Sequence, residues 1–295
     1  QGEPFGGTSI YAQYCIFRCA RDSGITVMLE GQGGDELLGG YVGYPGQMML
    51  SYLERHVFGD MINFAKNWSK WPGRNRFGAW RALIGQLLPD YSYNLANSLV
   101  GRKVDTACIN IPNLIENNVR KKPLRPRKSI QGKGRRLVET LLQSLTINGL
   151  PHLLRYGDRN AMAFSVENRV PFLTLPLCEF LLSLPECFLV SNSGETKAVF
   201  RRAMRGIVPD AILDRRDKVG FDTPMKVWMR KFISQDRDLL NNDGYIVCPI
   251  FRTSQLKAYV NDAFKSSEDF AWQMWRILNL NRWYQNTIMG NTPQN

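Results

Sequence analysis

A glycine-rich turn with two adjacent acids is the first place in this sequence where chemistry is expected. The stretch "ITVMLEGQGGDELLGGY", residues 25–41, is an apolar run followed by glycines around Gln32 and then by Asp35 and Glu36. Such a turn directs backbone N–H groups and the positive end of the next helix at one point, which suits an anion. Carboxylates repel phosphate, so two explanations stay open. Either the acids favour the helix dipole, or Asp35 holds a Mg²⁺ ion that bridges to phosphate oxygens.

A second segment, residues 153–185, embeds charged and amide side chains between apolar residues. Its polar members include Arg155, Asp158, Arg159, Asn160, Glu167 and Arg169. Polar groups in such surroundings serve either a binding site or structural salt bridges, and both explanations stay open.

A third segment, residues 194–228, contains two lysines in distinctive places. Lys197 precedes a basic helix, and Lys218 stands beside Gly220 and Phe221. A lysine in a glycine-containing turn between apolar residues is a point charge that suits a transferring phosphoryl or adenylyl group. The alternative for Lys218 is a solvent-exposed turn residue.

The elements around the glycine-rich turn predict how it is positioned. Residues 8–24 have the apolar spacing of a helix packed on one side, with Thr8 or Ser9 as its cap, and residues 25–29 are a β-branched run of strand length. Helix, glycine, strand, glycine-rich turn and helix is the order found in a parallel sheet of the βαβ type. Because a parallel strand cannot stand alone, we expect its neighbours to come from sequence outside this chain.

The remainder of the chain is predicted to be mostly α-helical, with this one clear parallel strand. Helices are expected over residues 47–67, 78–88 and 91–99, and a leucine-rich helix follows and stops near Gly149. A C-terminal helix is expected to seal a core with a set of large side chains. Its members are Phe270, Trp272, Trp275, Leu278 and Trp283.

The net charge of +12 is concentrated in residues 120–136, which hold nine Lys or Arg and no acid. Interspersed prolines and glycines predict a solvated loop or linker there. Contact with nucleic acid or acidic lipid is the alternative, although no aromatic residues interleave for base stacking. We therefore divide the chain into a nucleotide-site part, 1–119, a basic linker, 120–136, and a helical remainder, 137–295.

Composition argues against several other classes of protein. No apolar run approaches ~18 residues, so no membrane span is expected. Two histidines argue against a histidine-based metal site and against Ser–His catalysis. Scattered cysteines predict free thiols in a reducing compartment. The beginning at Gln1, within a proline-glycine loop, indicates a piece of a longer protein.

Six motifs together resemble the C-terminal synthetase domain of glutamine-dependent asparagine synthetases. They are "EPFGGTSIYAQY", "LEGQGGDELLGGY", "LLRYGDRNAMAFSVENRVPFL", "TKAVFRRAM", "VPDAILDRRDKVGF" and "WQMWRILNLNRW". They occur in the family order and cover nearly the whole chain outside the basic linker. The resemblance implies an α/β fold with a parallel sheet like that of the adenine nucleotide alpha hydrolases.

The resemblance also implies a reaction. ATP adenylates the side-chain carboxylate of aspartate with release of pyrophosphate, and ammonia from glutamine then attacks the adenylate to give asparagine. It implies that Asp35 binds Mg²⁺–pyrophosphate, that Lys218 stabilises the adenylation transition state and that Gln32 helps to form the intermediate. The residues implied in ATP binding are Leu29, Glu30, Gly31, Gly33 and Lys197. Those implied in substrate binding are Asp158, Glu167 and Arg169.

The chain departs from the family pattern in two kinds of feature. Glu30, Gly31 and Gln32 stand where Ser-Gly-Glu or a close variant is usual, and Thr174 stands where Asp is usual. The N-terminal Cys nucleophile of a glutaminase domain and a Ser-Gly-Gly-x-Asp-Ser pyrophosphate loop are both missing. We therefore expect a fragment or split piece that binds ATP poorly and makes no asparagine by itself, with the missing parts in cis or on a separate chain.

Two other functions are compatible with the sequence. One is a sibling amidotransferase or cyclase that adenylates another carboxylate, and the other is a nucleic-acid-binding module that uses the basic linker. The resemblance further implies a cytoplasmic protein that forms no membrane contact and is compatible with a homodimer.

Overall fold

The computed structural model describes residues 1–41, 44–75, 77–88, 133–217, 220–235, 247–252, 254–256 and 270–290. The helix predicted over residues 91–99, most of the basic linker and Lys218 lie outside these ranges. The division into parts at residues 119 and 136 stays a prediction. None of the described helices is long and apolar enough to span a membrane.

Helices dominate the described chain, as the sequence predicted. The N-terminal half contains α1 (Ser9–Asp22), β1 (Val27–Leu29), α2 (Gly34–Leu38), α3 (Pro45–Glu54), α4 (Phe58–Trp68), α5 (Gly78–Leu87) and α7 (Arg136–Thr146). Next come α8 (Leu150–Met162), β2 (Glu167–Arg169), the 3₁₀ helix η1 (Pro171–Leu173), α9 (Leu175–Ser183) and α10 (Glu186–Leu189). The remaining elements are α11 (Ala198–Ala203), α12 (Asp210–Leu213), α13 (Met225–Gln235), α16 (Phe270–Trp283) and the π-helical turn η2 (Tyr284–Ile288).

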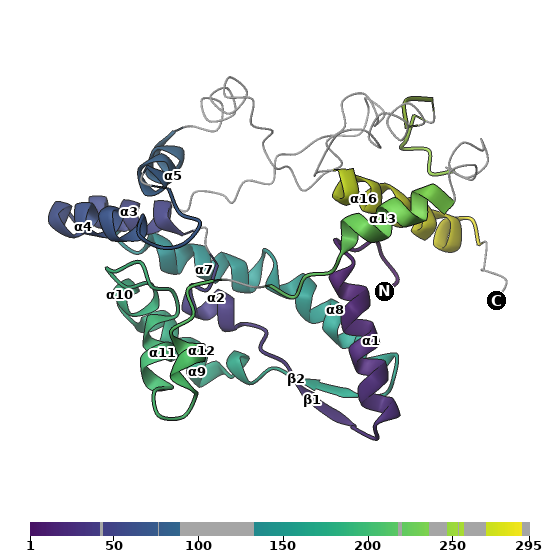
Figure 1. Ribbon diagram of the computed structural model, residues 1–295, viewed down its shortest axis with the longest axis horizontal. Helices are drawn as coiled ribbons and strands as arrows, with labels where there is room; N and C mark the ends of the chain where they lie inside the picture. Colours follow the sequence, from purple (N-terminus) through teal and green to yellow (C-terminus); the bar gives the residue numbers. More distant parts are fainter. Residues whose placement is uncertain are drawn as a thin grey trace.

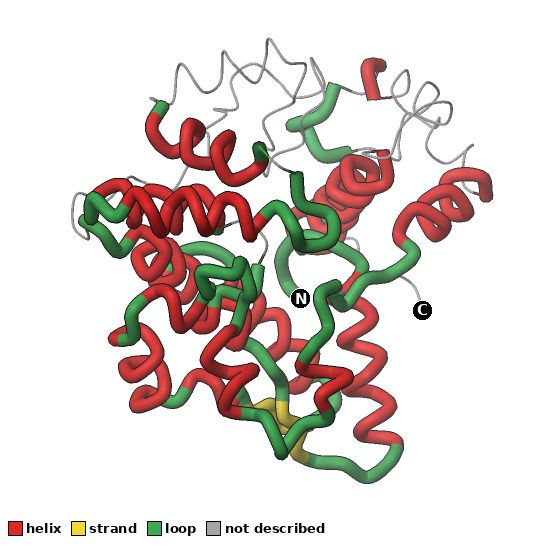
Figure 2. Tube along the Cα trace, turned by 60° about the vertical axis from the view of Figure 1, so that its left-hand side comes forward, coloured by secondary structure: helices red, strands yellow, loops and turns green. Residues whose placement is uncertain are grey.

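The two strands form a parallel pair that lies at one end of the molecule (Figures 1 and 2). Met28 pairs with Asn168, and Leu29 pairs with Arg169. The expectation that every neighbour of β1 lies outside this chain is therefore wrong, because β2 is supplied from within it. β2 was not predicted from the sequence because its three residues, Glu-Asn-Arg, are polar. They form a strand because they pair with β1.

One face of the strand pair is covered and the other is open. Met28 packs with Phe17 of α1 and with Ala161 and Val166, beside the end of α8. Leu29 on the opposite face is 70% exposed. Since side chains alternate between the faces of a strand, β1 and β2 together present an uncovered surface on this side.

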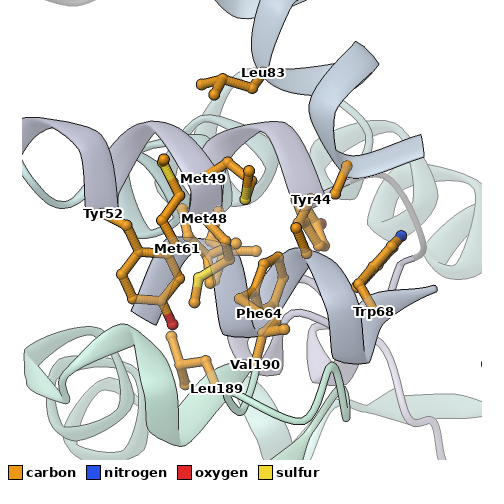
Figure 3. Packing of buried hydrophobic residues seen from close by; sticks show 14 of the residues in the cluster. Tyr44, Met48, Met49, Tyr52, Met61, Phe64, Trp68, Leu83, Leu189 and Val190 are labelled. Atoms are coloured by element: carbon orange, nitrogen blue, oxygen red, sulfur yellow. The ribbon is translucent and has the colours of Figure 1, made fainter. Parts of the chain in front are cut away.

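The main core lies where α2, α3, α4, α5, α7, α9 and α10 meet. Its fully buried members include Leu37, Met48, Phe64 and Leu189. Figure 3 shows aromatic and methionine side chains of α3 and α4 interlocking above Leu189 and Val190.

The helix predicted over residues 47–67 is divided into α3 and α4 by a turn at residues 55–57. His56 has φ 61°, a left-handed conformation, and Val57 N donates to Tyr52 O at 3.1 Å. The turn lets α4 pack back against α3, so that Tyr52 and Phe64 approach with ring centroids 5.8 Å apart. Burial of both apolar faces outweighs the helical propensity of the intervening residues.

The C-terminal helix α16 packs against α13 and anchors the N-terminal segment. Trp275 Nε1 donates to Phe5 O at 3.0 Å, and Trp283 Nε1 donates to Gly2 O at 3.0 Å. The predicted aromatic seal is only partly right, because Trp272 is 46% exposed whereas Met274 and Ile277 are fully buried.

The described end of the basic linker takes part in structural contacts. Arg136 forms an ion pair with Glu54 at 2.8 Å, and Arg135 donates to Leu182 O and Leu184 O. Although partial burial opposes the shift, hydrogen bonds from Arg136 and Gly134 N hold the pKa of Glu54 below its ordinary value. The two arginines thus have structural partners and do not indicate a nucleic-acid surface.

A buried acid, Glu186, caps helix α7 from a distant position in the chain. Its Oε1 accepts from Leu137 N at 2.7 Å and from Val138 N at 3.1 Å, in the first turn of α7. The side chain is 1% exposed, and this burial raises its pKa above the ordinary value. The folded protein therefore favours protonated Glu186. This contribution to stability is fully present below the unfolded-state pKa and is lost as the pH rises through the folded-state pKa.

Replacement of Glu186 by glutamine should remove this pH dependence. The amide keeps an acceptor for the two N–H groups but does not ionise. We expect the stability of Glu186→Gln relative to the wild type to improve as the pH rises from the unfolded-state pKa of Glu186 through its raised folded-state pKa, by about 1.4 kcal/mol for each unit by which the pKa is raised. Urea denaturation across this range measures the difference. The exposed Glu179→Gln is the control, and parallel profiles for Glu186→Gln and wild type would contradict the assignment.

Candidate functional site

The glycine-rich turn leaves β1 and enters α2 through a conformation that only glycine adopts easily. Gly33 has φ 89° and is the N-cap residue of α2. A Cβ added there would lie 2.3 Å from Leu173 Cδ2, so packing as well as backbone geometry requires glycine. Gly34 N donates to Gly31 O and Leu37 N donates to Gly33 O, which close the turn. Gly31 itself faces open space.

Glu30 is held at the start of the turn by amide side chains from α1 and β2. Gln13 Nε2 donates to Glu30 Oε1 at 2.6 Å, and Asn168 Nδ2 donates to Glu30 Oε2 at 3.0 Å. Its backbone N–H also continues the ladder by donating to Arg169 O at 2.8 Å. The carboxylate therefore points between α1 and β2 and orients the turn.

A second tier of amides supports this arrangement. The buried Asn160 donates through Nδ2 to Gln13 Oε1 and to Ile10 O, both at 2.9 Å. Asn160 thus fixes Gln13 on α1 while Gln13 fixes Glu30. The sequence analysis named Asn160 and Glu30 but missed Gln13 and Asn168. The signal for Gln13 was a polar residue on an otherwise apolar helix face. The signal for Asn168 was an amide between two charged residues.

The predicted metal ligand and one predicted ATP-binding lysine lie together. Lys197 Nζ and Asp35 Oδ1 are 2.6 Å apart, and both side chains are partly exposed. Gly40 makes room for the pair, because an added Cβ would lie 2.0 Å from Asp35 Oδ1 and 2.5 Å from Lys197 Cε. Residues 162 positions apart in the sequence are thereby joined into one charged site beside the turn.

The two acids of the turn have separate environments. Glu36 is 3% exposed and accepts from Tyr41 OH at 2.6 Å, whereas Asp35 reaches Lys197 at the surface. Burial, this hydrogen bond and the neighbouring carboxylates raise the pKa of Tyr41 well above its ordinary value. Tyr41 is therefore a fixed hydrogen-bond donor, and Glu36 serves the fold while Asp35 is available for chemistry.

Lys197 adopts a strained backbone at the start of α11. Its φ is 57°, in the left-handed region, and its N–H donates to Leu38 O at 3.1 Å, at the end of α2. Non-glycine residues adopt this conformation when the surrounding structure imposes it. The lysine is thus tied to the helix of Asp35 by its backbone as well as by its ammonium group.

The predicted substrate-binding residues occupy two other places. Glu167 and Arg169 lie on the exposed face of β2 and pair with each other at 2.7 Å, beside Leu29 of β1. Asp158 is exposed on α8, and within the described ranges no hydrogen bond or ion pair joins it to the other predicted residues. Gln32 is half-buried in the turn, and Lys218 lies outside the described residues.

The side chains near Asp35 offer one accessible carboxylate to a Mg²⁺ ion. Nowhere in the described part of the chain do three or more His, Cys, Asp or Glu side chains gather as a metal cage. Mg²⁺ usually keeps several waters and uses one or two carboxylates together with substrate phosphates. A single accessible carboxylate beside an ammonium group therefore fits an ion that arrives with a phosphate-bearing ligand.

Comparison with known proteins gives one family for this chain. The asparagine synthase family matches residues 1–285. The glutamine-hydrolyzing asparagine synthetase 1 of Bacillus subtilis (strain 168) is 26% identical over 286 residues, which is 90% of this chain and 41% of that protein. Putative glutamine-hydrolyzing asparagine synthetases of Mycobacterium bovis and Mycobacterium tuberculosis are 37% identical over 78 residues, 26% of this chain and 12% of each relative.

The chain spans about two fifths of the length of the Bacillus relative. No solved structure gives a significant match. The family match nevertheless covers nearly every residue, including the glycine-rich turn and both charged segments. The chain therefore belongs to the asparagine synthase family, whose fold is of the nucleotide alpha-hydrolase type.

Proposed function

We propose that this chain is the synthetase part of an ATP-dependent carbon–nitrogen ligase. In this proposal ATP adenylates the side-chain carboxylate of aspartate, and ammonia derived from glutamine attacks the adenylate to give asparagine. The observation that carries the proposal is the pairing of Asp35 with Lys197 beside the glycine-rich turn. A carboxylate and an ammonium group at the end of a parallel strand suit a nucleotide whose phosphates arrive with Mg²⁺.

The roles proposed for Gly31, Lys197 and Asp35 rest on their positions. Those proposed for Lys218 and Gln32 rest on the likeness to the family. Gly31 faces open space, so a nucleotide can approach the backbone closely there. Lys197 would donate to phosphate oxygens, and Asp35 would hold the magnesium ion, which supplies positive charge to the departing pyrophosphate when it is bound. Lys218 would stabilise the charge that develops on the α-phosphate, and Gln32 would contact the intermediate.

The open face of the strand pair is a suitable place for the acid substrate to bind. Glu167 and Arg169 project from this face next to Leu29, and both side chains of their ion pair are more than half exposed, so a competing carboxylate can reach them. We propose that Arg169, together with Asp158 and Glu167, contributes to the binding of aspartate. The assignment of ATP as cofactor, aspartate and glutamine as substrates and the cytoplasm as compartment belongs to the same proposal.

We further propose that the site is completed by a glutaminase domain and a pyrophosphate loop, in cis or on a separate chain. The observation in support is that Lys197 and Asp35, the two charged groups proposed for the phosphate site, are paired with each other. The chain by itself should therefore bind ATP weakly and form no asparagine. A homodimer is compatible with this arrangement.

Release of pyrophosphate tests the proposed function. The 295-residue chain and the longest gene product that contains it are each incubated with ATP, Mg²⁺ and aspartate, with glutamate and other acids in parallel. We expect aspartate-dependent pyrophosphate only from the longer protein. Preference for another acid would make the protein a sibling ligase. ATP- and Mg²⁺-dependent turnover by the 295-residue chain would contradict the proposed division of the site.

A further inference from the structure

A short closed loop, residues 191–196, delivers Lys197 to its position. Ser191 N donates to Glu195 O at 2.9 Å, and Gly194 N donates to Ser191 O at 2.8 Å. Val190, just before the loop, pairs with Thr196, at the end of the loop, as an antiparallel bridge. Any shift of this loop therefore moves the backbone of Lys197.

Side chains from a distant part of the chain hold successive residues of the loop. Trp71 Nε1 donates to Ser193 O at 2.8 Å, and Arg74 NH1 donates to Gly194 O at 2.8 Å. The residue before these, Asn192, is held in the same way: its carbonyl oxygen accepts from Asn67 at 3.3 Å, and its side-chain oxygen accepts from Tyr52 OH at 2.5 Å. Three consecutive loop residues are thus fixed from α3, α4 and the turn after α4.

Arg74 is itself anchored in the main core. Its guanidinium carbon lies 3.4 Å from the ring centroid of Trp68, which is 3% exposed, and 5.0 Å from that of Trp71. Burial lowers the pKa of Arg74 to about 10, so the group stays charged at neutral pH. A charged donor held against the rings of two tryptophans is a rigid support for the carbonyl of Gly194.

The other side of the loop is fixed close to the charged site. Arg201 Nε donates to Thr196 O at 3.0 Å, and Lys197 N donates to Leu38 O at 3.1 Å. The chain between these contacts adopts the left-handed conformation at Lys197, and its side chain then meets Asp35. The geometry of the charged site therefore depends on supports at both ends of the loop.

We propose that Arg74, together with Trp71, is a positioning residue that holds the loop so that Lys197 reaches the phosphate site. The inference rests on the proposed function of Lys197 and assigns a role to a segment that carries none of the predicted site residues. Neither residue touches the site, and both act through the backbone of the loop.

Four variants of the 295-residue chain test the proposal: Arg74→Ala, Arg74→Lys, Lys197→Ala and the double variant Arg74→Ala with Lys197→Ala. Lys66→Ala is the matched control, since it removes an exposed cation from α4. Amide hydrogen exchange across residues 191–198 reports the loop. Titration with magnesium pyrophosphate at millimolar concentration reports the phosphate site.

We expect Arg74→Ala to speed exchange at Lys197 and to weaken pyrophosphate binding by about tenfold, as for the loss of one charged hydrogen bond. Arg74→Lys should restore part of both, and Lys66→Ala should match the wild type. The double variant should bind no more weakly than Lys197→Ala, because Arg74 acts only through that lysine.

Two results would overturn the inference: unchanged exchange at Lys197 in Arg74→Ala, or losses of affinity that add in the double variant. The binding of magnesium pyrophosphate to the wild type and to Lys197→Ala tests the proposed function separately. If the wild type and Lys197→Ala bind magnesium pyrophosphate equally, Lys197 is no phosphate ligand, and the role of Arg74 toward phosphate falls with it. The exchange measurement still decides whether Arg74 sets the loop.

Discussion

Replacement of Asp35 by asparagine is expected to slow the release of pyrophosphate from ATP by about a hundred- to a thousand-fold, or ~3–4 kcal/mol. Asp35 is the accessible acid of the turn, and its Oδ1 is 2.6 Å from Lys197 Nζ. The amide keeps an acceptor for the lysine but loses the negative charge that a magnesium ion requires. The rate should therefore fall while the fold persists, because a partly exposed ion pair contributes about 1 kcal/mol or less to stability.

The measurement uses the longest gene product that contains this chain, with ATP and aspartate, over a range of Mg²⁺ concentration. Glu36→Gln is the matched control, because Glu36 is the adjacent acid but is buried against Tyr41. This control should lower stability by about 1 kcal/mol, the scale of one perturbed hydrogen bond. Its rate per folded molecule should equal that of the wild type. An Asp35→Asn protein with unchanged magnesium dependence would remove Asp35 from the metal site.

Replacement of Gly33 by alanine is expected to destabilise the protein by about 2–4 kcal/mol, from the left-handed backbone and from overpacking. The added Cβ would lie 2.3 Å from Leu173 Cδ2, while φ at this position is 89°. Leu173 belongs to η1, which packs next to α9, so relief of the overlap would disturb the main core as well as the turn.

Gly31→Ala is the matched control for Gly33→Ala within the same turn. Its Cβ would meet nothing within 4 Å, so we expect a change of stability within about 0.5 kcal/mol. Denaturation in urea, followed by circular dichroism, measures both variants. Gly31→Ala should also weaken the binding of ATP to the longer gene product if Gly31 lies beside the nucleotide. Equal stability of Gly33→Ala and wild type would show that the turn relaxes without cost.

Local patterns predicted the helix before the turn, the strand and the turn itself, because each depends on residues close in sequence. The structure confirms the helix predicted over residues 8–24 as α1 (Ser9–Asp22), and the strand predicted over residues 25–29 is present but shorter, as β1 (Val27–Leu29). The mostly helical character with a parallel strand is likewise confirmed. The six motifs led to the correct family because their order reflects the whole chain, whereas no motif by itself shows which side chains meet.

The features that the sequence did not reveal depend on distant partners. β2 is a strand only because it pairs with β1, and Gln13 becomes important only because α1 places it against Glu30. The pairing of Asp35 with Lys197 was not predicted either, although both residues were. Spacing along the chain identifies residue types that can do chemistry, but the approach of two segments is set by packing between helices.

The hydrogen bond between Asn168 and Glu30 joins residues 138 positions apart, and this separation has a consequence for the order of folding. The backbone bonds that close the glycine turn link near neighbours and form early, whereas long-range contacts form late because the intervening chain must first be closed into a loop. During synthesis, the ribosome must add 138 residues after Glu30 to reach Asn168. Glu30 can therefore pair early with Gln13, whereas its bond to Asn168 waits until β2 has been made.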